Sequence, residues 1–155
     1  MDDSRLIYLT TNSIAGSETT ATVLSGLTYH LLKTPRAFNA LKDEARSSFN
    51  SYSEINSIST QHLKYLNAVI EEGLRIYPPA PGGFPRVCPG GNVAGHYIPK
   101  GVTVSCNIMA TARSTRYWEN PNEFIPERWL DPRNTDNRAA SNPFSLGPRA
   151  CLGKK

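Results

Sequence analysis

Residues 144–153 read Phe-Ser-Leu-Gly-Pro-Arg-Ala-Cys-Leu-Gly. Cys151 therefore lies between Gly147 and Gly153, with Arg149 two positions before it. Glycine permits positive φ and a close approach of the backbone to a ligand. Neighbouring backbone N–H groups and a nearby cation stabilise a thiolate, the form of cysteine that binds metals. The stretch thus indicates a ligand-binding thiolate, although a lone cysteine in a glycine-rich turn is more often a buried structural thiol.

This stretch resembles the haem-binding loop of the cytochromes P-450, whose pattern is Phe-x-x-Gly-x-Arg-x-Cys-x-Gly. Every fixed position of the pattern is matched. The resemblance implies that Cys151 is the axial thiolate ligand of the iron in haem b, and that Arg149 binds a haem propionate. It also implies that Phe144 packs beside the sulfur and that Gly153 belongs to the haem-binding loop. A thiolate ligand pushes electron density toward the iron and favours O–O cleavage.

A second motif occupies residues 15–20, which read Ala-Gly-Ser-Glu-Thr-Thr. The ordinary interpretation is a polar patch on a helix. An acid beside a hydroxyl, after a glycine that lets the helix open locally, can also pass protons to a ligand. The motif is similar to the P-450 helix that crosses the distal face of haem. The resemblance implies that Thr19 is the alcohol of oxygen activation and that Glu18 is its acid partner, both catalytic.

A third motif pairs Glu72 with Arg75, three residues apart and therefore on one face of a helix. A solvated surface pair is the usual explanation of this spacing and contributes little stability. The family places such a Glu-x-x-Arg pair inside the protein, and residues 126–129, Pro-Glu-Arg-Trp, resemble its later meander motif. The resemblance therefore implies a partly buried network of Glu72, Arg75 and Arg128, which is structural and not catalytic.

Arg86 follows Phe84-Pro85 and precedes the segment expected to form a hairpin. In the family this strand lies at the edge of haem, so the resemblance implies that Arg86 contacts the second propionate. An ordinary surface arginine is the alternative. Residues 79–84 would then line the substrate pocket.

The three motifs occur in the order of the family, and the resemblance runs from about Leu6 to Lys155. Residues 81–86 and 142–149 look most like microsomal enzymes of filamentous fungi that act on secondary metabolites. A full member of the family is much longer. The resemblance therefore implies one partial domain over residues 1–155, truncated at both ends. Its expected fold is the C-terminal portion of the P-450 fold, mainly α with small β-hairpins.

The composition, 39% hydrophobic and 19% charged, is typical of an ordinary soluble globular domain. The net charge is +4, and basic residues are interleaved with acidic ones along the chain. Nucleic-acid-binding proteins carry dense clusters of basic residues, so this class of protein is excluded. A solvated surface or a docking face for an acidic partner explains the net charge. Cys88, Cys106 and Cys151 are too widely spaced to indicate a disulfide framework or a zinc site. No signal peptide and no membrane span are expected within the chain.

Only Pro35 precedes residue 77, and the other prolines lie from Pro78 to Pro148. Because proline breaks helices, the first part can be helical and the second mostly cannot. Hydrophobic spacing predicts three helices. The first covers about residues 5–32, the second begins after an N-cap at Thr34, and the third covers about residues 61–76. The side chains expected to face inward are Val23, Leu24, Leu27, Leu31 and Leu32, then Phe38, Leu41 and Ala45, then Leu63, Leu66, Ile70 and Leu74.

One hairpin is expected in the second half. Val93–Ile98 leads into the turn-forming residues 99–101, Pro-Lys-Gly, after which apolar residues alternate with polar ones as far as Ile108. A proline-rich aromatic meander without a regular period follows to Phe144.

The resemblance implies a monooxygenase that inserts one oxygen atom of O₂ into a lipophilic organic substrate, with electrons from NADPH through a reductase. The parent protein is expected at the cytosolic face of the endoplasmic reticulum membrane, without a nucleic-acid partner. The chain by itself is expected to be inactive. One alternative is a non-catalytic remnant without a stable haem site. Another is a family member that isomerises or dehydrates its substrate, against which the Glu18–Thr19 pair argues.

Overall fold

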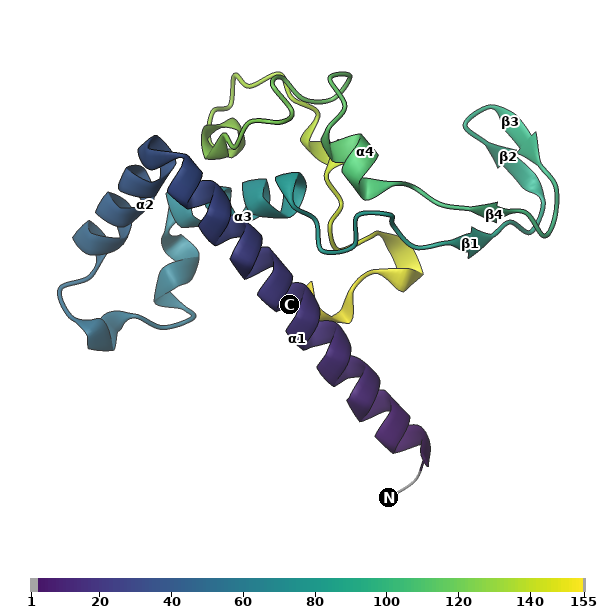
Figure 1. The fold of residues 1–155 in the computed structure, drawn as a ribbon, viewed down its shortest axis with the longest axis horizontal. Helices are drawn as coiled ribbons and strands as arrows, with labels where there is room; N and C mark the ends of the chain where they lie inside the picture. The colour runs from purple at the N-terminus through teal and green to yellow at the C-terminus, as the bar shows by residue number, and fades with distance from the viewer. Residues whose placement is uncertain (1–2, 155) are drawn as a thin grey trace.

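The computed structural model describes residues 3–154, without the side chains of residues 3–9 and 11. Its longest element is α1 (Asp3–Lys33), followed by α2 (Pro35–Ser48) and α3 (Lys64–Ile76). The helix α3 contacts α1, α2, the short helix α4 (Ile108–Ala112) and the 3₁₀ turn Pro126–Trp129. The first turns of α1 extend away from the other elements (Figure 1). The centre of the fold is therefore α3, against which both the long helix and the meander pack.

The three helices expected from hydrophobic spacing are present. Pro35 is the first residue of α2, as expected, but the side chain of Thr34 makes no capping hydrogen bond. The helix α3 begins at Lys64, later than expected, because Ser59–His62 form a 3₁₀ turn. Its N-terminus is capped from α2, since the carboxylate of Glu44 accepts hydrogen bonds from two of its first N–H groups at 2.8 and 2.9 Å. This cap joins α2 to α3.

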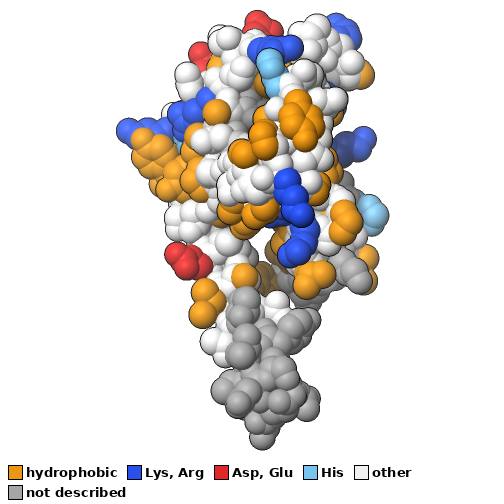
Figure 2. Space-filling model, turned by 90° about the vertical axis from the view of Figure 1, so that its right-hand side faces the viewer, with side chains coloured by type: hydrophobic (Ala, Val, Ile, Leu, Met, Phe, Trp, Pro, Cys, Tyr) orange, Lys and Arg blue, Asp and Glu red, His pale blue; other side chains and the backbone are white. Residues whose placement is uncertain are grey.

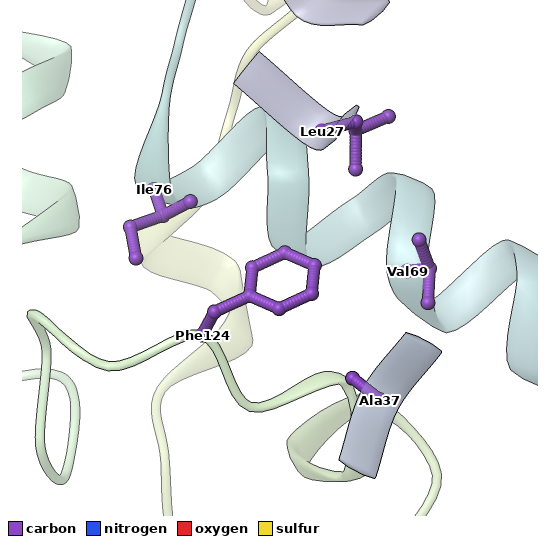
Figure 3. Packing of buried hydrophobic residues seen from close by; sticks show 5 residues of the cluster. All are labelled: Leu27, Ala37, Val69, Ile76 and Phe124. Atoms are coloured by element: carbon purple, nitrogen blue, oxygen red, sulfur yellow. The ribbon is translucent and has the colours of Figure 1, made fainter. Parts of the chain in front are cut away.

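The hydrophobic core lies where α1, α2, α3 and the meander meet. It consists of Leu27, Ala37, Val69, Ile76 and Phe124 (Figure 3). Full burial of each large apolar side chain contributes about 1.5–3 kcal/mol. Phe124 belongs to the meander, so the core holds this irregular segment against the helices.

Several side chains expected inside are exposed: Leu24, Leu32, Phe38 and Ile70. Leu24 and Ile70 line a cavity that is described below. Periodicity shows which face of a helix is apolar, but not whether a neighbour or an open cavity lies against it. Conversely, the buried face of α3 includes the charged residues Glu72 and Arg75, which the periodicity does not mark.

The strands form two separate antiparallel pairs. In one, β1 (Arg86–Val87) pairs with β4 (Thr103–Val104), and in the other β2 (Gly91–Val93) pairs with β3 (His96–Ile98). Their exposed side chains include large apolar ones. Figure 2 views the molecule from the side on which Figure 1 places these strands, and it shows hydrophobic side chains at the surface beside lysine and arginine.

The prediction of a hairpin around residues 99–101 is wrong, because the strands on either side of these residues, His96–Ile98 and Thr103–Val104, do not pair with each other. The tight turn lies at Ala94 and Gly95, whose φ values of 49° and 86° are those required by the two-residue turns that join antiparallel strands. Residues 99–102 do turn, but this turn joins strands of different pairs. The apolar residue Ile108 begins α4, where the side chain of Asn107 accepts the N–H of Ala110 at 2.9 Å.

The architecture is mainly helical with small antiparallel strand pairs, as predicted. The meander and the segment that carries Cys151 consist of loops and 3₁₀ turns, namely Pro126–Trp129, Arg138–Ala140, Gly147–Arg149 and Leu152–Lys154. Within residues 3–154, no helix has both the length and the apolar character that crossing a membrane requires.

Candidate functional site

A cavity of about 630 Å³ separates α1 from the segment that carries Cys151. Its volume is within the usual range of small-molecule sites, about 300–1,000 Å³. The lining residues come from four segments: Thr19, Thr20, Val23, Leu24 and Leu27 of α1; Ile70 and Leu74 of α3; Pro79, Ala80, Phe84 and Arg86; and Pro143, Phe144, Ser145, Arg149, Cys151 and Gly153. Thr19 and all of the residues predicted to bind a cofactor therefore face one space.

The loop around Cys151 is held by backbone hydrogen bonds. The N–H of Cys151 donates to the carbonyl of Phe144 at 2.8 Å, and that of Ala150 donates to Gly147 at 3.0 Å. Gly147 has a φ of 71°, a conformation that glycine adopts without strain. Gly153 lies beside the sulfur, since a Cβ built on it would stand 3.7 Å from Sγ of Cys151. The thiol is free and exposed, and so can bind a metal ion in the cavity.

Two hydroxyl groups reach the cavity from α1. Oγ1 of Thr19 donates to the carbonyl of Ala15 at 2.6 Å, and Oγ1 of Thr20 donates to Gly16 at 2.7 Å. Because a hydroxyl also has two acceptor lone pairs, each oxygen can still accept a hydrogen bond. The expected opening of the helix at Gly16 is absent, since α1 is α-helical throughout.

Glu18 does not join Thr19 in the cavity. It is exposed and is not among the lining residues. In residues 3–154 the hydrogen bond of the Thr19 hydroxyl goes to Ala15, not to Glu18. Consecutive residues of a helix do not face each other, so an acid and an alcohol at adjacent positions point in different directions. The roles predicted for Glu18 and Thr19 stay predictions. Since no hydrogen bond joins their side chains in the described residues, any exchange of protons between them requires water.

Two guanidinium groups complete the lining. Arg149 ends the 3₁₀ turn Gly147–Arg149, and Arg86 lies on β1 with Nη1 donating to the carbonyl of Pro85 at 2.9 Å. Both residues are exposed, and within the described chain neither forms an ion pair with a carboxylate. Arginine binds carboxylates with a planar pair of donors.

The donor set fits haem b. One thiol stands on one side of the cavity, two hydroxyl groups stand on the other, and the side chains between them are mostly apolar. The two arginines match the two propionates of the macrocycle in number and in charge. A zinc site would need further nitrogen or sulfur ligands, and the residues lining the cavity supply none beyond Cys151.

Behind the cavity, Glu72 and Arg75 form a bidentate ion pair whose side chains are both 0% exposed. Nε and Nη2 of Arg75 each donate to the carboxylate at 2.8 Å. The other three N–H groups donate to backbone carbonyls of Ala112, Pro121 and Glu123 at 2.7–3.1 Å. All five donors of the guanidinium are thus used, and they join α3 to α4 and the meander.

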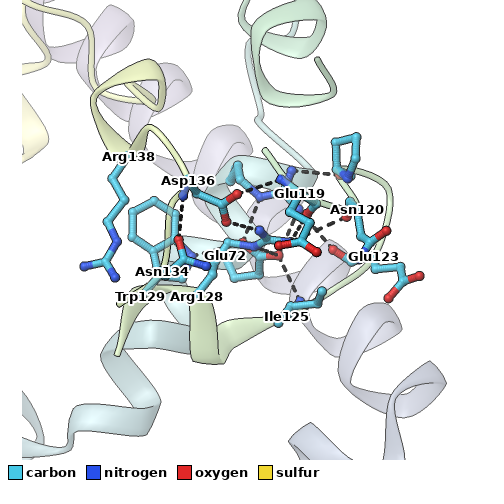
Figure 4. A network of polar contacts seen from close by, with 12 residues as sticks. Glu72, Glu119, Asn120, Glu123, Ile125, Arg128, Trp129, Asn134, Asp136 and Arg138 are labelled. Carbon is cyan, nitrogen blue, oxygen red and sulfur yellow. Dashed lines mark hydrogen bonds and ion pairs between the residues drawn. The ribbon is translucent and has the colours of Figure 1, made fainter. Parts of the chain in front are cut away.

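Arg128 is the third member that the sequence predicted, and it lies in contact with the pair. Its Nε donates to the carboxylate of Glu72 at 3.2 Å, and its side chain is 2% exposed (Figure 4). Its Nη2 donates to the carbonyl of Glu119 at 3.1 Å. The structure therefore brings Glu72, Arg75 and Arg128 together in the interior.

Sequence reasoning missed three further members of this network. Nε1 of Trp129 donates to Glu72 at 3.0 Å. The ring of Trp118 lies 5.1 Å from the guanidinium of Arg75 and 5.8 Å from that of Arg128. Asp136 forms an ion pair with Arg128. The position of Trp129 beside Arg128 was a usable signal, whereas nothing in the sequence around Asp136 marks it.

Several ionisable groups near the core have shifted pKa values. Partial burial alone would raise the pKa of Asp136, but hydrogen bonds from the Glu119 N–H and from Arg128 outweigh it and hold that pKa below its ordinary value. Glu127 behaves likewise, since hydrogen bonds from Arg36 and Tyr65 overcome its burial and lower its pKa.

His30 of α1 stacks on Phe124 with ring centroids 5.5 Å apart. Partial burial, helped by the nearby charge of Arg113, lowers the pKa of His30. The neutral imidazole is therefore favoured where α1 meets the core.

Comparison with known proteins identifies the family. The chain matches the family model "Cytochrome P-450" over residues 2–155. It is 48% identical over 147 residues to the cytochrome P-450 monooxygenase BOT4 of Botryotinia fuckeliana, with 95% of this chain and 28% of that protein covered. It is 49% identical over 152 residues to the cytochrome P-450 monooxygenase btcC of Colletotrichum orbiculare, with 93% and 29% covered. This chain thus spans 28–29% of the length of these relatives, and it belongs to the cytochrome P-450 family.

Proposed function

We propose that this chain is the C-terminal part of a haem-thiolate monooxygenase that inserts one oxygen atom from O₂ into a lipophilic organic substrate. The observation that carries the proposal is the cavity in which Cys151 stands opposite the hydroxyl groups of Thr19 and Thr20. The relatives are named cytochrome P-450 monooxygenases, which agrees with this activity. Electrons would come from NADPH through a reductase, and the parent protein would act at the cytosolic face of the endoplasmic reticulum membrane.

In this proposal the cofactor is held by residues on both sides of the cavity. Cys151 binds the iron as a thiolate, while Phe144 and Gly153 surround the sulfur. Arg149 and Arg86 bind the two propionates, for which their free guanidinium donors are suited. When bound, haem supplies the activation of O₂, a chemistry that amino-acid side chains lack.

Thr19 would hold and deliver a proton on the α1 side. Its hydroxyl donates to the carbonyl of Ala15 and can still accept a hydrogen bond, and Thr19 lines the cavity. Rotation of the hydroxyl about Cβ–Oγ1 would then turn its proton from the carbonyl of Ala15 toward the cavity. Glu18 is exposed, so it would replenish this proton through water and not by direct contact.

The apolar side chains of the cavity define the substrate class. Leu24 is 59% exposed and Phe84 is 53% exposed, and both line the cavity. Burial of such surface by a ligand is favourable at about 25 cal/mol per Å². The proposal therefore predicts lipophilic substrates.

The alternative, a remnant without a stable haem site, concerns this chain in isolation. In the described residues, hydrogen bonds made by the segment 139–154 stay within residues 137–154, so the ligand loop depends on few ties to the helices. We expect no NADPH-dependent product from residues 1–155 alone.

The test is turnover by the longest natural chain that carries this sequence, with a reductase, NADPH and isotopically labelled O₂. We expect product that contains one labelled oxygen atom, and water that contains the other. Product labelled from water, or no product with a broad panel of lipophilic compounds, would contradict the proposed reaction.

A further inference from the structure

The network behind the cavity is electrically incomplete without a fourth member. Glu72, Arg75 and Arg128 together carry one negative and two positive charges, a net charge of +1. Their side chains are 0–2% exposed, and an uncompensated charge at such depth is costly. The side chain of Asp136, itself 1% exposed, pairs with Arg128 and brings the net charge to zero. The buried unit is therefore a neutral tetrad of two acids and two arginines.

Both carboxylate oxygens of Asp136 are bound by residues that come earlier in the chain. Oδ2 pairs with Nη1 of Arg128, and Oδ1 accepts the backbone N–H of Glu119 at 2.6 Å (Figure 4). The backbone N–H of Asp136 donates to Oδ1 of Asn134 at 2.9 Å. Position 136 is thus fixed to the turn Pro126–Trp129 and to the meander before it.

After residue 138, few hydrogen bonds connect the described chain to the rest of the protein. Through the described residues 139–154, backbone hydrogen bonds are local, such as Ser145 to Asn142 at 3.0 Å and Cys151 to Phe144 at 2.8 Å. The preceding ties are the N–H of Asn137 to the carbonyl of Tyr117, the side chain of Arg138 to the carbonyl of Asp131, and the carboxylate of Asp136.

Among these ties, the carboxylate of Asp136 is both buried and charge-assisted, a combination that makes a strong and directional contact. The tie through Arg138 ends on the carbonyl of Asp131, a neutral acceptor, and is only partly buried. The position of residues 139–154 relative to α1 therefore depends mainly on the contacts of Asp136.

We propose that Asp136 is a positioning residue for Cys151: its buried carboxylate fixes the start of the segment that carries the thiol. It thereby sets where the thiol stands relative to Thr19 and Thr20 across the cavity. The inference rests on the proposed function, because the placement of the thiolate matters only if Cys151 binds haem iron.

The test compares Asp136→Asn with the wild type in the longest natural chain that carries this sequence. The substitution keeps the shape and one acceptor oxygen but removes the charge. Asp131→Asn is the matched control, because Asp131 lies in the same meander but is 41% exposed, and its ion-pair partner among the described residues is Arg133. Two quantities are measured: the red-shifted Soret band of thiolate-ligated ferrous haem with carbon monoxide, and amide hydrogen exchange of residues 139–151.

In Asp136→Asn we expect haem to remain bound while most of it loses the thiolate band. Exchange of residues 139–151 should rise by about tenfold or more, the effect of losing one charged hydrogen bond. Exchange in α3 should rise by less than that of residues 139–151, because the lost charge also costs the buried network some stability. The far-ultraviolet circular dichroism should stay as in the wild type. Asp131→Asn should change none of these quantities.

A variant with the wild-type band and wild-type exchange would overturn the inference. So would exchange that rises equally over α1, α3 and residues 139–151, because that pattern indicates loss of global stability instead of misplacement. A wild type that binds haem without the thiolate band would refute the proposed function, and hydrogen exchange would still decide whether Asp136 anchors the segment.

If Asp136→Asn does not fold, Asp136→Glu takes its place. It keeps the charge but displaces the carboxylate by one methylene group, so it cannot meet both Arg128 and the N–H of Glu119 in the same closed space. We expect it to fold and to lose part of the thiolate band. A full band in this variant would show that the position of the carboxylate does not matter, and the inference would be wrong.

Discussion

Replacement of Arg75 by alanine tests the buried network most severely. The substitution leaves the carboxylate of Glu72, which is 0% exposed, without its bidentate partner. It also removes the donors to three backbone carbonyls, those of Ala112, Pro121 and Glu123. Breaking a buried ion pair by removing one partner costs about 3–5 kcal/mol. Arg128 still reaches Glu72 and limits the loss, so we expect a value in this range and not above it.

That loss is a large fraction of the stability of a typical domain, about 5–15 kcal/mol. The assay is denaturant unfolding of the longest natural chain that carries this sequence, followed by circular dichroism, with haem content measured in parallel. We expect a lower midpoint and lost haem incorporation, without a change in substrate range. Arg133→Ala is the control, because Arg133 is 89% exposed and its pair with Asp131 contributes at most about 1 kcal/mol.

An Arg75→Ala protein with the wild-type midpoint and full haem content would refute this reasoning. It would mean that solvent reaches Glu72, or that Arg128 alone neutralises it.

Three further predictions follow from the site and its surroundings. Thr19→Ala should leave haem content unchanged but release more peroxide and less product per NADPH consumed, and unchanged coupling would move the role to Thr20 or to water. Gly83→Ala should be strongly destabilising, because φ is +69° and the added Cβ would meet the carbonyl oxygen of Cys106 at 2.0 Å, whereas Gly82→Ala, with nothing within 4 Å, should be nearly neutral by thermal unfolding. The lowered pKa of Asp136 means that its stabilising contribution is present above the ordinary Asp pKa of about 3.9 and is lost as pH falls through the lower folded-state value. Asp136→Asn should therefore lose less stability on acidification than the wild type, and equal slopes of unfolding free energy against pH would contradict the shift.

The sequence was most informative where the chemistry is local. The pattern around Cys151 and the spacing of Glu72 and Arg75 are short-range, and the helices follow from periodicity that each segment carries in itself. The structure places these residues around one cavity and in one buried network, while their chemical roles stay predictions.

Other features depend on partners far away in the chain, and there the sequence failed. The strands on either side of residues 99–101 alternate as a hairpin would, but they do not pair with each other. β3 pairs with β2 just before it, and β4 pairs with β1, further back in the chain. Asp136 lies in an ordinary polar stretch, and only the folded chain shows that its carboxylate neutralises Arg128. Leu24 has the spacing of a core residue, yet it faces the cavity. Glu18 and Thr19 are neighbours in sequence, but only Thr19 lines the cavity.

The proposed function depends on Cys151 binding haem iron as a thiolate. The most direct measurement is the ferrous carbon monoxide spectrum of the longest natural chain, compared among the wild type, Cys151→His and Cys106→Ser. Cys106 is the matched control, since it is also free and exposed but does not line the cavity. We expect the red-shifted Soret band in the wild type and in Cys106→Ser, and its complete loss in Cys151→His. A band that survives in Cys151→His would contradict the claim.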